Sequence, residues 1–141
     1  MNRATCTCCL MLIGLAGLAW ALPQEHPAPL AGVPETSAEK LQKELGRGQK
    51  ILIIDGRRPA DFAAGHVPGA VNVPFADFGK RFAELRVPKD TTVVTVCDHG
   101  GRSSRAALEL RKLGYKTSSF CTLDSWKKQG YKIETGAKNH I

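Results

Sequence analysis

The sequence predicts an α/β fold, because short apolar runs typical of buried strands alternate with segments of helical periodicity. The run at 51–54 is continuously apolar, as in a strand buried on both faces. A second run at 91–96 is rich in β-branched residues and ends at Cys97. With 141 residues, 43% hydrophobic and 23% charged, the chain has the size and composition of one globular domain.

The first 21 residues have the pattern of a signal peptide. Arg3 supplies a positive start, an apolar stretch follows from Cys9 to Leu18, and Ala19-Trp20-Ala21 is a small-x-small cleavage site. We expect cleavage near Ala21, a periplasmic or secreted bacterial protein, and no stable membrane anchor afterwards. The alternative is an uncleaved anchor, which the pattern disfavours because a spanning helix needs roughly 20 apolar residues.

Residues 22–35 are rich in proline and small residues and are interpreted as a linker. A first helix is expected from Thr36, with Thr36 or Ser37 as its N-cap. It should place Leu41 and Leu45 on one face and end at Gly46 or Gly48.

The strand at 51–54 ends at Asp55, a carboxylate that needs a partner if it is buried. Arg57 or a backbone amide can supply that partner, so we assign both side chains to structural support. His66 follows among turn residues, before a short strand at 70–73. A histidine that fastens this loop is a better interpretation of His66 than a catalytic base, because no nucleophile or carboxylate pair lies beside it in sequence.

Cys97 lies between the second strand and a helical pattern at 103–113, which stops at Gly114. The start of a helix collects unpaired backbone N–H groups and the positive end of the helix dipole. Such a position stabilises an anion and favours the thiolate form of the cysteine. The sequence therefore predicts a reactive thiol in the loop 97–103.

Composition excludes several other classes of site. After removal of the signal, only Cys97 and Cys121 remain, and no Cys/His spacing resembles a zinc site, so we expect no metal. The net charge of +7 is scattered without interleaved aromatic residues, which disfavours nucleic-acid binding. The positive charge fits attraction of small anionic substrates instead.

Two motifs resemble the rhodanese family. Residues 51–75 are similar to its first signature, with Asp55-x-Arg57, Gly65-His66-Val67-Pro68-Gly69-Ala70 and Asn72 in place. Residues 93–114, with Cys97-x-x-Gly100-x-Arg102-Ser103, resemble its active-site loop and the helix that follows. With Trp126 and Gly130-Tyr131, the resemblance covers a domain at about 36–135, which leaves 136–141 as a tail.

This resemblance implies a three-layer fold with a central, mainly parallel five-stranded sheet and helices on both faces. It also implies a sulfurtransferase without a cofactor. Cys97 would take a sulfur from a small anionic donor such as thiosulfate, hold it as a persulfide, and pass it to cyanide or to a thiol, including a protein thiol. The implied substrate-binding loop comprises Asp98, His99, Gly100, Gly101, Arg102 and Ser103.

Three alternatives remain open. Four residues separate Cys97 from Arg102, whereas related cysteine phosphatases use five, so phosphatase or arsenate-reductase activity is a distant alternative. A noncatalytic redox-sensing or partner-binding module is another. Cys121 is interpreted as a small buried hydrophobic residue, with a resolving thiol for Cys97 as the alternative. It belongs to the segment 120–126, which lacks the Gly-Gly pair usual in rhodaneses, so the turn before Trp126 must be made differently.

Overall fold

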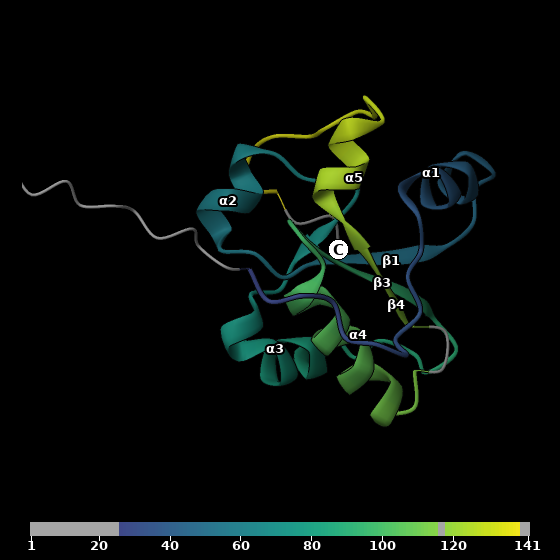
Figure 1. The fold of residues 1–141 in the computed structure, drawn as a ribbon. Coiled ribbons are helices and arrows are strands. Elements are labelled where there is room, and N and C mark those ends of the chain that lie inside the picture. Colours follow the sequence, from purple (N-terminus) through teal and green to yellow (C-terminus); the bar gives the residue numbers. More distant parts are fainter. Residues whose placement is uncertain (1–25, 116–117, 139–141) are drawn as a thin grey trace, which may run out of the picture.

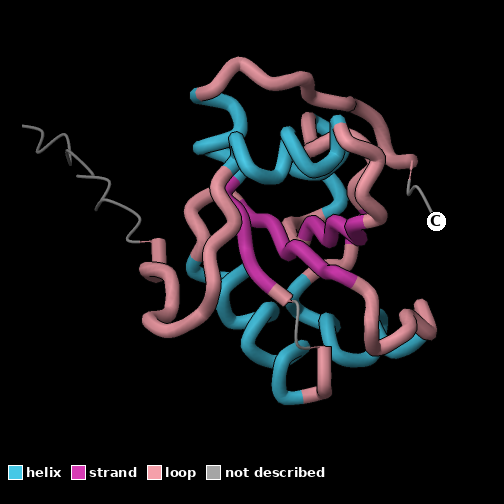
Figure 2. Tube along the Cα trace, turned by 90° about the vertical axis from the view of Figure 1, so that its right-hand side faces the viewer, coloured by secondary structure: helices cyan, strands magenta, loops and turns pink. Residues whose placement is uncertain are grey.

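A computed structural model describes residues 26–115 and 118–138, and places four parallel strands of this part of the chain between layers of helices (Figures 1 and 2). The strands lie in the order β2-β1-β3-β4. Their bounds are β1 Ile51–Asp55, β2 Val71–Asn72, β3 Thr92–Cys97 and β4 Ser119–Thr122. The predicted signal peptide, residues 1–21, lies outside the described residues.

The helices divide between the two faces of the sheet. On one face lie α1, α2 and α5, and on the other lie α3 and α4. Their bounds are α1 Ala38–Gly46, α2 Pro59–Ala64, α3 Phe78–Glu84, α4 Gly101–Lys112 and α5 Leu123–Lys128, and a 3-10 turn over Phe75–Asp77 precedes α3. The α/β class with helices on both faces is therefore confirmed.

The expectation of five strands is corrected to four in the described part of the chain. A single parallel bridge between Glu35 and Phe120 stands at the edge where a fifth strand would pair. The pairing ends there for a local reason. Pro34 has no N–H to donate, and Ser37 already caps α1, so the chain leaves the extended conformation after one bridge.

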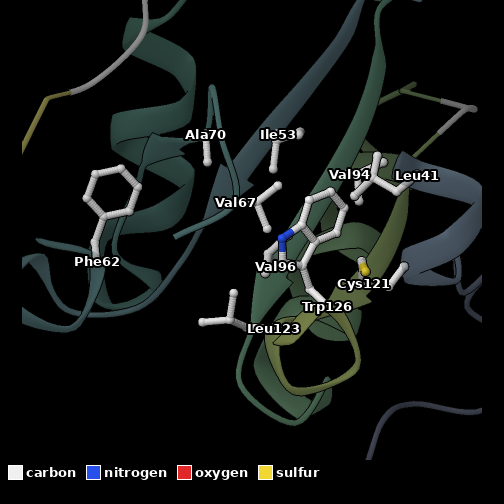
Figure 3. Packing of buried hydrophobic residues seen from close by; sticks show 11 residues of the cluster. Leu41, Ile53, Phe62, Val67, Ala70, Val94, Val96, Cys121, Leu123 and Trp126 are labelled. Carbon is white, nitrogen blue, oxygen red and sulfur yellow. The ribbon is translucent and has the colours of Figure 1, made fainter. Parts of the chain in front are cut away.

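Side-chain alternation along the strands gives each face its own core. Ile53, Val94, Val96 and Cys121 contact helices α1, α2 and α5 around the buried Trp126 (Figure 3). The adjacent residues of β1 and β3 point the other way and pack against α3 and α4. Both faces of the sheet are covered, which explains the uninterrupted apolar run of β1.

Several predicted elements match the structure closely. The first helix is α1, and the Ser37 hydroxyl accepts a hydrogen bond from the Lys40 amide at 3.2 Å. The strand expected at 51–54 extends one residue further, to Asp55. The helix expected at 103–113 begins two residues earlier, at Gly101.

The described part of the proline-rich segment lies against the domain. The Thr36 amide donates to the Phe120 carbonyl at 2.8 Å, and the Phe120 amide donates to the Pro34 carbonyl at 3.1 Å. Further upstream, the Leu30 amide donates to the Ser104 hydroxyl at 2.9 Å. Residues 26–35, drawn in purple and blue in Figure 1, thus run beside α4 and the edge strand β4. The predicted linker is in contact with the domain over this part of its length.

Parallel pairing brings the carboxyl ends of β1, β3 and β4 to one edge of the sheet. Asp55 pairs with Val96, and Cys97 pairs with Thr122. The chain leaves β1 toward β2 on one side and leaves β3 toward β4 on the other, so the two loops diverge between β1 and β3. Such a point of divergence is where open α/β sheets bind ligands. None of the helices in the described ranges has the length and apolarity needed to cross a membrane.

Candidate active site

The Cys97 side chain lies under the loop that joins β3 to α4. Its sulfur is within hydrogen-bond distance of two backbone amides, at 3.2 Å from the Gly100 nitrogen and 3.4 Å from the Ser103 nitrogen. The Ser103 hydroxyl lies 3.3 Å from the same sulfur. When Cys97 is a thiolate, this hydroxyl can turn to donate a third hydrogen bond. The predicted anion-binding loop therefore surrounds the sulfur with donors from the first turn of α4.

A side chain would not be tolerated at either of the two glycines of the loop, for different reasons. Gly100 has a φ of 91°, which L side chains rarely adopt. Gly101 has no left-handed backbone, but a Cβ atom there would overlap the carbonyl oxygen of Pro27. Behind the loop, the Thr95 hydroxyl donates to the Ser103 carbonyl at 2.7 Å and fixes the first turn of α4 to β3.

Asp98, the residue that follows Cys97, forms ion pairs with two arginines. Its carboxylate accepts from the Arg57 guanidinium at 3.4 Å and from the Arg102 guanidinium at 3.4 Å. Two cations thus offset the negative charge that the sequence places next to Cys97. Arg102, expected to attract the donor, also orients the loop through this contact with Asp98.

Arg57 connects three segments of the site from a buried position. Its guanidinium contacts both carboxylate oxygens of Asp55, the shortest contact being 2.7 Å. A second bond from the same terminal nitrogen reaches the Gly65 carbonyl at 2.7 Å. Burial lowers the pKa of Arg57, but its hydrogen bond to Asp55 and the charges of Asp55 and Asp98 outweigh burial and raise the pKa above its ordinary value. Arg57 therefore keeps its charge, and the predicted supporting role of Asp55 and Arg57 fits this geometry.

His66 lies in the turn that Arg57 fastens through the Gly65 carbonyl. Its ring is stacked on Phe62 at 3.7 Å, and Nδ1 lies 2.8 Å from the Phe62 carbonyl oxygen. Its backbone pairs with that of Glu134. These contacts fit a histidine that fastens the loop, which is the role the sequence predicts for it.

Two side chains that sequence reasoning did not assign to the site border the loop. Asp124, at the start of α5, lies 2.7 Å from Nδ1 of His99. His26, from the proline-rich segment, also contacts the His99 ring, with ring centroids 4.1 Å apart. The segment 120–126 makes its turn with Thr122, whose hydroxyl accepts from the Ser125 amide at 3.3 Å and caps α5. Thr122 stands in the ordinary N-cap position before α5 and takes the place of the flexible Gly-Gly pair.

Cys121 points to the opposite face of the sheet from Cys97. It pairs with Val96, the neighbour of Cys97 in β3, and adjacent residues of a strand face opposite sides. Its side chain belongs to the core under α1 and α5, and burial raises its pKa to about 11. Both thiols are free. This placement supports the interpretation of Cys121 as a core residue.

In residues 26–115 and 118–138, no cluster of three or more His, Cys, Asp or Glu side chains could hold a metal ion. At this edge of the sheet, the thiol of Cys97 is surrounded by hydrogen-bond donors.

Comparison with known proteins matches residues 37–128 to the family described as "Rhodanese-like domain". A sulfurtransferase of Allochromatium vinosum is 36% identical over 83 residues, which cover 59% of this chain and 76% of that protein. A thiosulfate sulfurtransferase of Pseudomonas aeruginosa is 31% identical over 126 residues, 69% of this chain and 46% of that protein. The chain thus spans less than half the length of this second relative.

Among solved structures, the Alr3790 protein from Anabaena superposes with a TM-score of 0.65 at 26% identity. The superposition covers 71% of this chain and 81% of the Anabaena chain. The likeness therefore extends over most of both chains.

We expect a large loss of stability when the buried Asp55–Arg57 ion pair is broken. We expect Asp55→Asn to lower the free energy of unfolding by about 3–5 kcal/mol, because it leaves the Arg57 charge buried without its partner. Urea denaturation measures this change. Asp61→Asn is the matched control, since Asp61 pairs with the exposed Arg58 at 2.8 Å and its loss should leave stability unchanged. Equal effects of the two substitutions would contradict the role given to Arg57.

The two thiols should differ sharply in reactivity. At pH 8 we expect iodoacetamide to label Cys97 and to spare Cys121, because a pKa of about 11 leaves only roughly a thousandth of Cys121 as thiolate. Labelling of Cys121 should rise about tenfold per pH unit up to its pKa while the fold persists. Peptide mapping by mass spectrometry assigns each adduct. Labelling of Cys121 as fast as Cys97 in the native protein would contradict this assignment.

Proposed function

The chain belongs to the rhodanese-like domain family, and on that premise we propose that it is a sulfurtransferase in which Cys97 carries sulfur as a persulfide. One observation supports the proposal above the rest. The Cys97 sulfur lies within hydrogen-bond distance of the Gly100 and Ser103 amides at the start of α4. These donors stabilise a negative sulfur without any rearrangement of the backbone.

The proposed first half-reaction uses thiosulfate. The Cys97 thiolate attacks the outer sulfur of the donor, a new S–S bond forms, and the bond between the two thiosulfate sulfurs breaks. Its electron pair leaves with sulfite, and Cys97 holds a persulfide anion. The amides that faced the thiolate can then face the terminal sulfur. The name of the Pseudomonas relative supports thiosulfate as the donor.

In the second half-reaction, an acceptor attacks the outer sulfur of the persulfide. Cyanide becomes thiocyanate, or a thiolate becomes a new persulfide, and the electron pair of the broken S–S bond returns to Cys97. The two steps together return Cys97 to its starting thiolate, because the donor brings Cys97 to the persulfide level and the acceptor reverses that change, and neither step requires a cofactor. A thiol, including a protein thiol, is therefore as suitable chemically as cyanide.

The small cavity at Cys97 favours sulfur over phosphate as the transferred group. A cavity of about 10 Å³ lies at Cys97 and is lined by residues that include His99, Gly101 and Arg102. That volume is about enough for one water-sized group. It suits a single additional sulfur better than a phosphate with four oxygens, which supports sulfur transfer over phosphatase chemistry.

We also propose that the protein is exported. Cleavage near Ala21 would place the enzyme in the periplasm or outside the cell and would keep His26 and the rest of the described N-terminal segment in the mature protein. The positive start and apolar stretch of residues 1–18 support this location.

The experiment that tests the proposed function is thiosulfate:cyanide turnover, with Cys97→Ser as the comparison. We expect thiocyanate from the wild-type protein and at least a thousandfold less from the variant, because a hydroxyl cannot form the persulfide. Cys121→Ser is the matched control and should retain turnover. A folded wild-type protein that produces no thiocyanate would favour the sensing or partner-binding module instead.

A further inference from the structure

The cavity at Cys97 is closed on one side by the N-terminal segment. Pro27 and His26 belong to its lining, together with Cys97 and residues of the loop. The Leu30 amide holds this segment to the Ser104 hydroxyl at 2.9 Å. Because the cavity has room for about one water-sized group, the body of any sulfur donor must lie elsewhere.

A second cavity of about 390 Å³ adjoins the first and shares His26 and Arg102 with it. Its other charged lining residues come from four segments of the chain. They are Arg57 and Arg58 after β1, Asp61 in α2, Asp98 in the loop, and Lys127 in α5. This volume is within the range of small-molecule sites in proteins.

The charges around this cavity favour an anion. Four cationic side chains face two carboxylates, and three of the cations already have partners. Arg57 and Arg102 contact Asp98, and Arg58 pairs with Asp61. Their guanidinium groups, with Arg58 contributing most, lower the pKa of Asp61.

Lys127 differs from the other three cations. Within the described ranges, no carboxylate lies within ion-pair distance of its ammonium group. Its charge remains available to a ligand in the cavity. Lys128, the next residue of the same helix, is also exposed but does not line the cavity.

We propose that this cavity is an anion subsite in which Lys127 and His26 bind the negatively charged part of the sulfur compound while its terminal sulfur reaches Cys97. The inference rests on the proposed function and deepens it. The ligand group is a sulfonate or a carboxylate. Thiosulfate carries a sulfonate-like group, and the persulfide of a small thiol that bears carboxylates carries a carboxylate. When thiosulfate reacts, the sulfite that is released as the S–S bond of the donor breaks departs into this subsite.

The first test compares Lys127→Gln with Lys128→Gln in the full-length protein. The two variants lose the same charge from the same helix, so net charge is matched. We expect Lys127→Gln to raise KM for thiosulfate about three- to tenfold with kcat within twofold, because one charge-assisted contact to the donor is lost. Lys128→Gln should match the wild type. Equal KM values in both variants would overturn the subsite.

A second measurement needs no turnover and separates the subsite from the proposed function. Methanesulfonate and S-methylglutathione, which cannot transfer sulfur, serve as the sulfonate and carboxylate probes. Each is titrated against the rate at which iodoacetamide labels Cys97. Protection that weakens about three- to tenfold in Lys127→Gln alone supports the subsite, and the better protector identifies the ligand group. No protection by either probe, or equal protection in both variants, would overturn it even where wild-type turnover is normal.

Discussion

The buried ion pair between Asp55 and Arg57 is the contact on which the rest of the site depends. Asp55 ends β1, and Arg57 uses one planar guanidinium to reach that carboxylate, the Gly65 carbonyl and the carboxylate of Asp98. A lysine could not replace it, because a single ammonium group lacks this fork of donors. The pair therefore couples the end of one strand to the loop that begins at the end of its neighbour.

The sheet brings this pair to Cys97 because all four strands of the described residues are parallel. Their carboxyl ends meet at one edge, and the chain diverges between β1 and β3 at that edge. The N-terminus of α4 then directs two amides at the Cys97 sulfur. Cys121 is one residue away in register but faces the opposite core, so the fold places one thiol at the hydrogen-bond donors of the loop and the other in the hydrophobic core. The chemistry proposed for the protein follows from this placement of one side chain.

The sequence predicted the features that local signals determine. A buried strand followed by a glycine-rich loop and a helix identified Cys97, and a serine before a helical pattern identified the cap of α1. Helix α2 was missed because six residues are too few to show a period, and β4 because its four residues carry no distinct strand pattern. The neutralisation of Asp98 by Arg57 could not be foreseen, since 41 positions separate the two residues. The proline-rich composition of residues 26–35 indicated a linker, and only tertiary contacts reveal that this segment borders the active-site loop.

The most direct test of the account is to load the protein with thiosulfate in the absence of an acceptor and to locate the transferred sulfur by peptide mass spectrometry. The account predicts one additional sulfur atom per chain, carried by the peptide that contains Cys97 and released by cyanide as an equal amount of thiocyanate. A folded protein that acquires no sulfur, or acquires it on Cys121, would contradict the claim that the loop after β3 forms a persulfide site.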